Sequence, residues 1–231
     1  MSTFVLVPGA GGARWYWHRV VPLLELAGHA AIAIDLPGDD ETAGLADYAR
    51  IVTGAIDGRD DVVVVAQSLG GFAAAMVAAR PELCALVFVN AMIPVPRETP
   101  GAWWANTGAV EARTAAAQRD GYPAEFDPFV YFLHDLAPDV VAAGEPHQRP
   151  EADAVFGSAC DFAAWPPLPI HVVAGEQDRF FPVEFQQAVA RTRLGVEPDL
   201  LPGGHLVALS QPDALAGYLV GRLKSGPPTS M

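Results

Sequence analysis

The stretch Val62–Gly71, which reads VVVVAQSLGG, decides the fold. Its apolar run predicts a buried strand over Asp61–Gln67 that passes directly into a helix, with Ser68 at the corner. So sharp a turn strains the corner residue and needs small side chains two positions before and after it, which Ala66 and Gly70 provide. The turn lifts the hydroxyl to the carboxyl edge of the sheet, where open α/β sheets bind ligands. The plainer alternative is a serine that caps an ordinary helix.

Similar apolar runs, rich in β-branched residues, recur on both sides of this stretch. They predict further strands over Thr3–Val7, His29–Asp35, Cys84–Asn90, Ile170–Ala174 and Pro198–Leu201. Helical periodicity alternates with them, over Arg14–Ala27, Thr42–Ile56, Leu69–Ala79, Pro182–Leu194 and Gln211–Lys224. Within the first of these helices, Pro22 is expected to kink the helix or to begin its regular part. The alternation predicts an α/β fold with a mostly parallel six-stranded sheet and helices on both faces.

One long segment breaks this alternation. Residues 95–167 are rich in proline and aromatic side chains and lie between two predicted strands. A loop of that length without structure is improbable, so we expect a helical cap subdomain there. The core domain is then formed by residues 1–94 and 168–224, and the tail 225–231 is expected to be disordered.

Composition excludes several classes of protein. The chain has 231 residues, of which 51% are hydrophobic and 18% charged, which predicts one large packed domain. A net charge of −13 argues against nucleic acid and membrane-surface partners. The absence of an apolar run of about 18 residues or of a signal peptide favours a cytoplasmic protein. The two cysteines, Cys84 and Cys160, are expected to be reduced core residues.

Two later loops offer partners for the serine. His205 follows Gly203 and Gly204 between the last strand and the last helix, where a general base can reach the same sheet edge. Asp178 and Glu176 both follow the preceding strand, and either carboxylate could orient the imidazole. Asp178 is preferred because it lies farther out on its loop. No spacing of His, Cys or Asp suggests a metal site.

The oxyanion of an attacked carbonyl needs two backbone donors. Leu69 supplies one N–H at a helix N-terminus, and Ala10, on the glycine loop after the first strand, is expected to supply the other. The same loop partly resembles a dinucleotide fingerprint, with Asp35 at the end of the next strand, but Arg14 occupies the third glycine position. A nicotinamide oxidoreductase is therefore the weaker alternative, since it leaves the serine and its two partners unexplained.

Taken together, these motifs resemble the α/β-hydrolase superfamily over nearly the whole chain. Within it, the chain is similar to the branch that holds plant methylesterases, hydroxynitrile lyases and their bacterial relatives. The motifs are FVLVPGA (Phe4–Ala10), DLPG (Asp35–Gly38), QSLGG (Gln67–Gly71), FVNAMIP (Phe88–Pro94) and GGHL (Gly203–Leu206). The resemblance implies a nucleophilic Ser68 with His205 as base and Asp178 as acid, Ala10 and Leu69 as oxyanion donors, an apolar pocket beneath a cap, and no cofactor.

The expected activity is cleavage of a small hydrophobic or aromatic ester through an acyl-enzyme intermediate. Lyases of this branch resemble one another in a threonine at the position of Gly9 and a lysine at that of Leu206, which favours hydrolysis here. The expected pocket residues are Met92, Trp103, Trp104, Phe129, Phe132 and Phe162. Alternatives are a lyase, cyclase or perhydrolase using the same site, or a silent protein that binds a small ligand. The sequence does not set the oligomeric state, for which a homodimer is one candidate.

Overall fold

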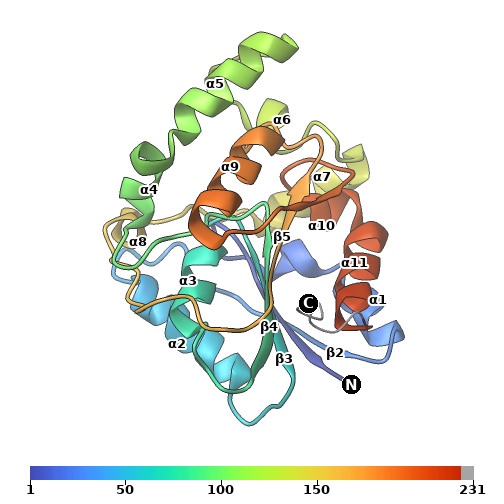
Figure 1. The fold of residues 1–231 in the computed structure, drawn as a ribbon. Coiled ribbons are helices and arrows are strands. Elements are labelled where there is room, and N and C mark those ends of the chain that lie inside the picture. The colour runs from blue at the N-terminus through green and yellow to red at the C-terminus, as the bar shows by residue number, and fades with distance from the viewer. Residues whose placement is uncertain (225–231) are drawn as a thin grey trace, which may run out of the picture.

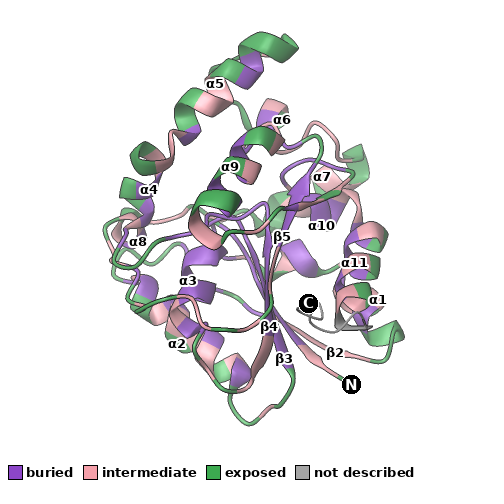
Figure 2. Ribbon diagram, viewed as in Figure 1, coloured by how far each residue is buried: buried purple, intermediate pink, exposed green. Residues whose placement is uncertain are grey.

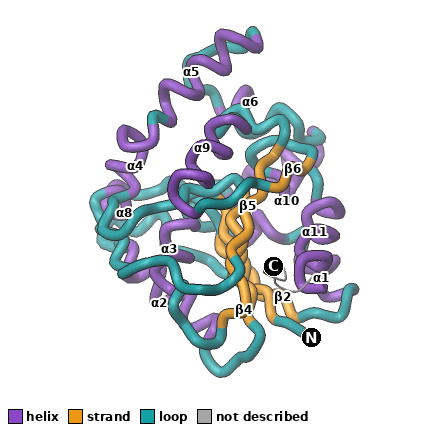
Figure 3. The backbone as a smooth tube through the Cα atoms, in the orientation of Figure 1, coloured by secondary structure: helices purple, strands orange, loops and turns teal. Residues whose placement is uncertain are grey.

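A computed structural model describes residues 1–224 of the chain. Its centre is a six-stranded sheet in the order β2-β1-β3-β4-β5-β6, with all neighbouring strands parallel (Figures 1 and 3). The strands are β1 (Thr3–Val7), β2 (Ala30–Ala33), β3 (Val62–Gln67), β4 (Leu83–Val89), β5 (Ile170–Gly175) and β6 (Asp199–Leu201). The predicted α/β fold and six-stranded parallel sheet are confirmed.

Alternate side chains of the central strands feed two separate cores. Val62 and Val64 of β3 belong to one apolar cluster, whereas Val63 and Val65 belong to the other. Every residue of β3 is buried (Figure 2), which is why its sequence is apolar without alternation. The sheet is therefore covered on both faces.

Helices from different parts of the chain cover each face. The first face packs against α2 (Leu45–Ile56), α3 (Gly70–Val77) and α9 (Val183–Leu194). The second packs against η1 (Arg14–Trp17), α1 (Val21–Leu26), α10 (Val207–Ser210) and α11 (Pro212–Lys224). No helix within residues 1–224 is both long and apolar enough to cross a membrane.

The predicted helix Arg14–Ala27 is wrong as one continuous element. The structure has a short 3-10 helix, η1, and then α1, with Pro22 in the first turn of α1. A proline fits there because the first N–H groups of a helix have no partner within it. The second half of the prediction, that Pro22 begins the regular part, is confirmed.

The segment between β4 and β5, residues 90–169, is called the insertion below. It holds α4 (Pro100–Thr107), α5 (Ala109–Asp120), α6 (Pro128–Tyr131), α7 (Pro138–Gly144), η2 (Glu145–His147) and α8 (Asp153–Phe156). Figure 1 shows α5, α6 and α7 beyond the carboxyl ends of the strands. Its Trp103 and Cys160 join the core cluster of the first face, so the insertion shares packing with the core. The predicted tail 225–231 lies outside the described residues.

Candidate active site

Ser68 occupies the corner between β3 and α3, and its backbone is strained as predicted. Its φ angle is +49°, in the left-handed region that side chains rarely adopt. The corner is tightly enclosed, because a Cβ on Gly70 would lie 2.4 Å from Pro8 O, and one on Gly71 would lie 2.1 Å from Met92 O. The Met92 N–H donates to Ser68 O at 3.0 Å, which fixes the corner to the segment after β4. The serine is therefore held in one position by backbone on both sides.

The structure brings together the three side chains that the sequence singled out. Ser68 Oγ lies 3.2 Å from His205 Nε2, and His205 Nδ1 lies 2.9 Å from Asp178 Oδ2. His205 and Asp178 are 2% and 5% exposed, and Ser68 is 8% exposed. Ser68 and His205 lie 137 positions apart along the chain, and Asp178 and His205 lie 27 apart, so the fold of the parallel sheet makes them neighbours. A hydroxyl, an imidazole and a carboxylate in this sequence form a path along which a proton can move.

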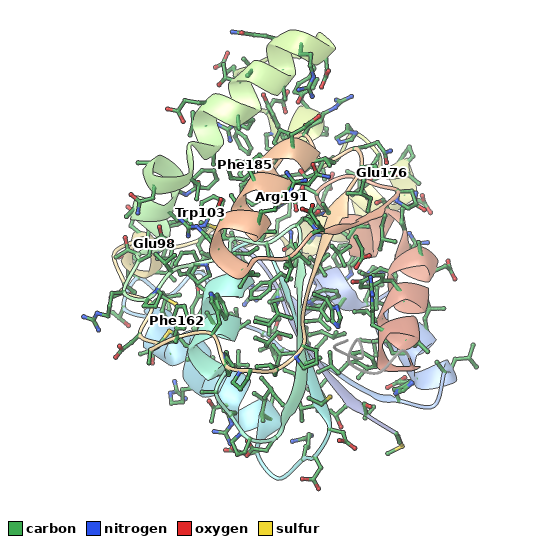
Figure 4. The ribbon with its side chains drawn as sticks, in the orientation of Figure 1. Glu98, Trp103, Phe162, Glu176, Phe185 and Arg191 are labelled. Atoms are coloured by element: carbon green, nitrogen blue, oxygen red, sulfur yellow. The ribbon has the colours of Figure 1, made fainter. Side chains whose placement is uncertain are left out.

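The carboxylate of Asp178 has a full set of donors despite its burial. Its Oδ1 accepts the backbone N–H groups of Phe180 and Phe181 at 2.8 and 2.9 Å, and its Oδ2 accepts Gln186 Nε2 at 3.2 Å as well as the imidazole. These bonds replace water around the charge and fix the carboxylate plane. Glu176, the alternative carboxylate, is exposed (labelled in Figure 4) and has no hydrogen bond to His205 among the described residues.

Three phenylalanines enclose the His205 ring. Phe132 stacks on it with centroids 5.1 Å apart, while Phe180 and Phe181 approach by their edges at 5.0 and 5.2 Å. Sequence reasoning named Phe132 but missed the other two. The signal available was their position directly after Asp178, since an Asp that accepts the N–H groups of the next two or three residues folds them back over itself.

Asn90 is a third residue that sequence reasoning missed as part of the site. It is fully buried at the end of β4 with a φ of +46°. Its Nδ2 donates to Gly204 O and His205 O at 3.0 and 3.1 Å, and its Oδ1 accepts the Gly175 N–H at 2.7 Å. The amide therefore ties the histidine loop to the end of β5. A polar residue closing an apolar strand was the signal that could have found it.

The two backbone N–H groups that were expected to form an oxyanion hole belong to Ala10 and Leu69. Among the described residues, neither Ala10 N nor Leu69 N donates to a protein acceptor, whereas their neighbours Gly11 and Gly71 do. Gly9, next to Ala10, lies against Ser68, because a Cβ there would be 2.8 Å from Ser68 Cβ. Two donors left free beside a nucleophile can accept developing negative charge.

The six expected pocket residues do not form one group. Phe132 contacts His205, and Met92 is buried behind the serine corner. Trp103, labelled in Figure 4, is fully buried, and its Nε1–H donates to Ile93 O. Trp104 packs edge-on against Phe180.

The remaining two pocket candidates lie elsewhere. Phe129 is 69% exposed, so the structure does not place it in an enclosed pocket. Phe162 packs on Trp165, which in turn contacts Phe88 of β4 (Figure 4 labels Phe162). Both are separated from the contacts that surround the imidazole.

A cavity of about 170 Å³ lies beside residues 8–12, the loop after β1. This loop is called the oxyanion loop below because it carries Ala10, the expected oxyanion donor. None of the six expected pocket residues lines the cavity. Its walls are mostly apolar and come from the loop after β1, from the insertion and from the segment after His205, including Ala10, Trp15, Leu133, Val140 and Leu206. Leu206 occupies the position at which the hydroxynitrile lyases of the similar branch carry a lysine. The cavity wall therefore has an apolar side chain there instead of a charged one.

The features that suggested a dinucleotide are engaged within the protein. Asp35 forms ion pairs with Arg14 at 3.2 Å and Arg149 at 3.3 Å. The space beside Gly11 is filled, because a Cβ there would lie 2.6 Å from Arg149 O. The glycine loop thus serves close packing against the insertion. Among residues 1–224, no group of three or more His, Cys, Asp or Glu side chains is arranged to hold a metal ion.

The alpha/beta hydrolase family model matches residues 4–217. The chain belongs to this family. Over 103 residues it is 37% identical to norfluorocurarine synthase 1 of Strychnos nux-vomica, a match that covers 39% of each protein. Over 104 residues it is 36% identical to methylesterase 7 of Arabidopsis thaliana, covering 39% of this chain and 40% of that protein. These matches therefore span about two fifths of the relatives' length.

Solved structures extend the likeness of the fold over the whole chain. Polyneuridine aldehyde esterase superposes with a TM-score of 0.78 at 19% identity, covering 96% of this chain and 99% of that one. A pyrethroid hydrolase from Sphingobium faniae JZ-2 gives a TM-score of 0.75 at 18% identity, covering 97% and 98%. At these identities the likeness concerns the fold.

Proposed function

We propose that this protein is a serine hydrolase that cleaves a small hydrophobic or aromatic ester. The observation that carries the proposal is the hydrogen-bonded path from Ser68 Oγ through His205 to Asp178, with distances of 3.2 and 2.9 Å. The family membership and the esterases among the relatives support the same activity.

The mechanism is two-step acyl transfer. His205 Nε2 takes the Ser68 proton as the hydroxyl oxygen attacks the ester carbonyl, and Asp178 stabilises the imidazolium that forms. The N–H groups of Ala10 and Leu69 hold the oxyanion. His205 then protonates the departing alcohol, and a water molecule, activated by the same imidazole, releases the acid and restores the serine.

The surroundings of the imidazole favour this proton transfer. The three phenylalanine rings exclude water from its faces, so the charges that form during attack interact in a medium of low polarity. The fixed bonds to Asp178 Oδ1 leave Oδ2 to accept the proton on Nδ1. Nε2 is therefore the nitrogen free to accept the serine proton.

The cavity, which reaches Ala10 and Gln67 but is not lined by Ser68 or His205, supports a substrate of limited size. Its volume of about 170 Å³ is close to the ~150 Å³ that accommodates one benzene ring in an apolar protein cavity. Its apolar walls match a short branched chain or a single aromatic ring as one side of the ester. A cap formed by residues 95–167, which include Leu133 and Val140 of the cavity wall, belongs to the same proposal.

The direct test uses Ser68→Ala and a short p-nitrophenyl ester. We expect the variant to keep its circular dichroism spectrum and its melting temperature and to lose ester cleavage. Cleavage at the wild-type rate by the purified variant would remove the proposal.

A second candidate is non-hydrolytic chemistry at the same site, and the synthase among the relatives favours keeping it. Lyase, cyclase and perhydrolase reactions differ from hydrolysis in the fate of water. In water enriched in ¹⁸O, hydrolysis places one labelled oxygen in the carboxylic acid product. A product without the label would favour the second candidate.

A further inference from the structure

The insertion contacts the catalytic loops through two carboxylates. Glu151, between η2 and α8, accepts the backbone N–H of Gly11 on its Oε2. Asp135, between α6 and α7, accepts the backbone N–H of Gly204 on its Oδ2 at 2.6 Å. Gly11 directly follows Ala10, and Gly204 directly precedes His205. Each carboxylate thus holds the peptide unit next to a group that the proposed reaction uses.

The contact at Glu151 is one of several that fix the oxyanion loop against the insertion. The other Glu151 oxygen accepts the Tyr48 hydroxyl of α2, so the carboxylate bridges the loop and the core. Beside it, the Ala152 N–H donates to Gly38 O at 2.6 Å. Gly11 has a φ of +80° and no room for a Cβ, because Arg149 O would lie 2.6 Å away. The loop conformation therefore depends on a segment about 140 residues further along the chain.

Folding stability does not explain why an ionisable side chain stands at Glu151. Burial raises the pKa of this carboxyl, although the bonds from Tyr48 and Gly11 oppose the shift. A carboxyl whose pKa is higher in the folded state than in the unfolded state contributes less to stability as the pH rises through that range. Ionisation of this side chain in the folded protein therefore costs folding free energy, which is typical of a residue kept for function.

Asp135 lies in an equally constrained place. A Cβ on Gly204 would lie 2.9 Å from Asp135 Oδ1 and 2.9 Å from His134 Nε2. Asp135 Oδ1 is buried without a hydrogen-bond partner among the described residues. The carboxylate therefore holds the histidine loop by one short hydrogen bond and by close packing. Asn90 holds the same loop by donating to the carbonyl oxygens of Gly204 and His205.

We propose that Glu151 and Asp135 are positioning residues, which set the Ala10 N–H and the His205 imidazole in their working geometry. The inference rests on the proposed serine hydrolase activity. The insertion then does more than cover the substrate, because it completes both the oxyanion hole and the orientation of the general base. Neither side chain touches the reacting atoms in this scheme.

The test compares kcat and KM for a p-nitrophenyl ester, per active site. In Glu151→Ala and Asp135→Ala we expect kcat to fall about 10- to 100-fold, with KM changed less than about threefold. This fall is part of the roughly 10²–10³-fold in kcat that one oxyanion donor contributes. Glu151→Gln and Asp135→Asn keep an acceptor oxygen and should recover most of the lost rate. Matched controls are Glu125→Gln and Asp139→Asn, two exposed carboxylates of the insertion, which should leave kcat unchanged.

Stability separates positioning from a general loss of fold. Glu151→Gln should melt at or above the wild-type temperature at a pH where the carboxyl is ionised, because partial burial disfavours its charged form. Wild-type kcat in either alanine variant would overturn the assignment for that loop, as would a loss of rate with a proportional loss of folded protein.

Hydrogen exchange gives a measurement that does not depend on ester cleavage. The peptide containing Gly11 should exchange faster in Glu151→Ala than in wild type, and unchanged exchange would also refute the assignment for that loop. If wild type cleaves no ester while exchange responds as expected, the proposed function fails and the positioning of the loop stands.

Discussion

Replacement of Asp178 by asparagine tests the proposed proton path most sharply. Asp178 Oδ1 accepts two backbone N–H groups, at Phe180 and Phe181. In the variant these donors keep the amide oxygen on their side, so the amide nitrogen must face His205 Nδ1. An NH₂ group at that place donates to Nδ1, which forces the imidazole proton onto Nε2. The nitrogen beside Ser68 then carries a proton and cannot accept another.

The expected loss is large because the wrong tautomer predominates. We expect kcat/KM for a p-nitrophenyl ester to fall about 10⁴-fold, which corresponds to about 5 kcal/mol of lost transition-state stabilisation. Glu176→Gln makes the same chemical change two residues earlier on an exposed side chain and should keep the wild-type rate. A rate within tenfold of wild type in Asp178→Asn, with the variant folded, would refute the proton path.

Two further predictions concern packing and a buried ion pair. Gly9→Ala would place a Cβ 2.8 Å from Ser68 Cβ, so we expect it to cost about 1–3 kcal/mol of stability and at least tenfold in kcat. Gly54→Ala, at an exposed helix position with nothing within 4 Å, should stabilise by about 0.5–1 kcal/mol. Thermal melting and kinetics check both, and an unaffected Gly9→Ala would contradict the tight packing at the serine. Burial acts to raise the pKa of Glu98, but the hydrogen bonds that the carboxylate accepts, above all those from Arg193, outweigh burial and lower the pKa. The contribution of Glu98 to stability should therefore be lost as the pH falls below about 4.5. Arg193→Ala should lower the free energy of unfolding by about 3–5 kcal/mol near pH 7, and this loss should shrink in acid. Urea unfolding at several pH values measures it, and a loss that does not change with pH would contradict a stabilising ion pair.

The sheet could be predicted from the sequence because its strands are short apolar runs between glycines, prolines and charged residues. All six predicted strands overlap the observed ones, with β2 the most shortened, at Ala30–Ala33 instead of His29–Asp35. The convergence of Ser68, Asp178 and His205 could be predicted for the same reason. Each follows a parallel strand, and parallel strands bring their carboxyl ends to one edge.

The insertion could not be predicted in the same detail. Phe129 and Tyr131 lie two residues apart on α6, yet one is 69% exposed and the other fully buried. The orientation of so short a helix is set by what packs on it, and no periodicity in four residues reveals that. The contacts of Glu151 and Asp135 join positions 140 and 69 residues apart, and only the folded chain shows them.

The proposed function requires the serine at the β3–α3 corner to be an activated nucleophile. Treatment of the wild-type protein with a fluorophosphonate, followed by peptide mapping, measures this without knowledge of the substrate. We expect one covalent adduct, located on Ser68, whose formation is greatly slowed in His205→Ala. Intact protein without an adduct, or an adduct formed equally fast without the imidazole, would contradict it.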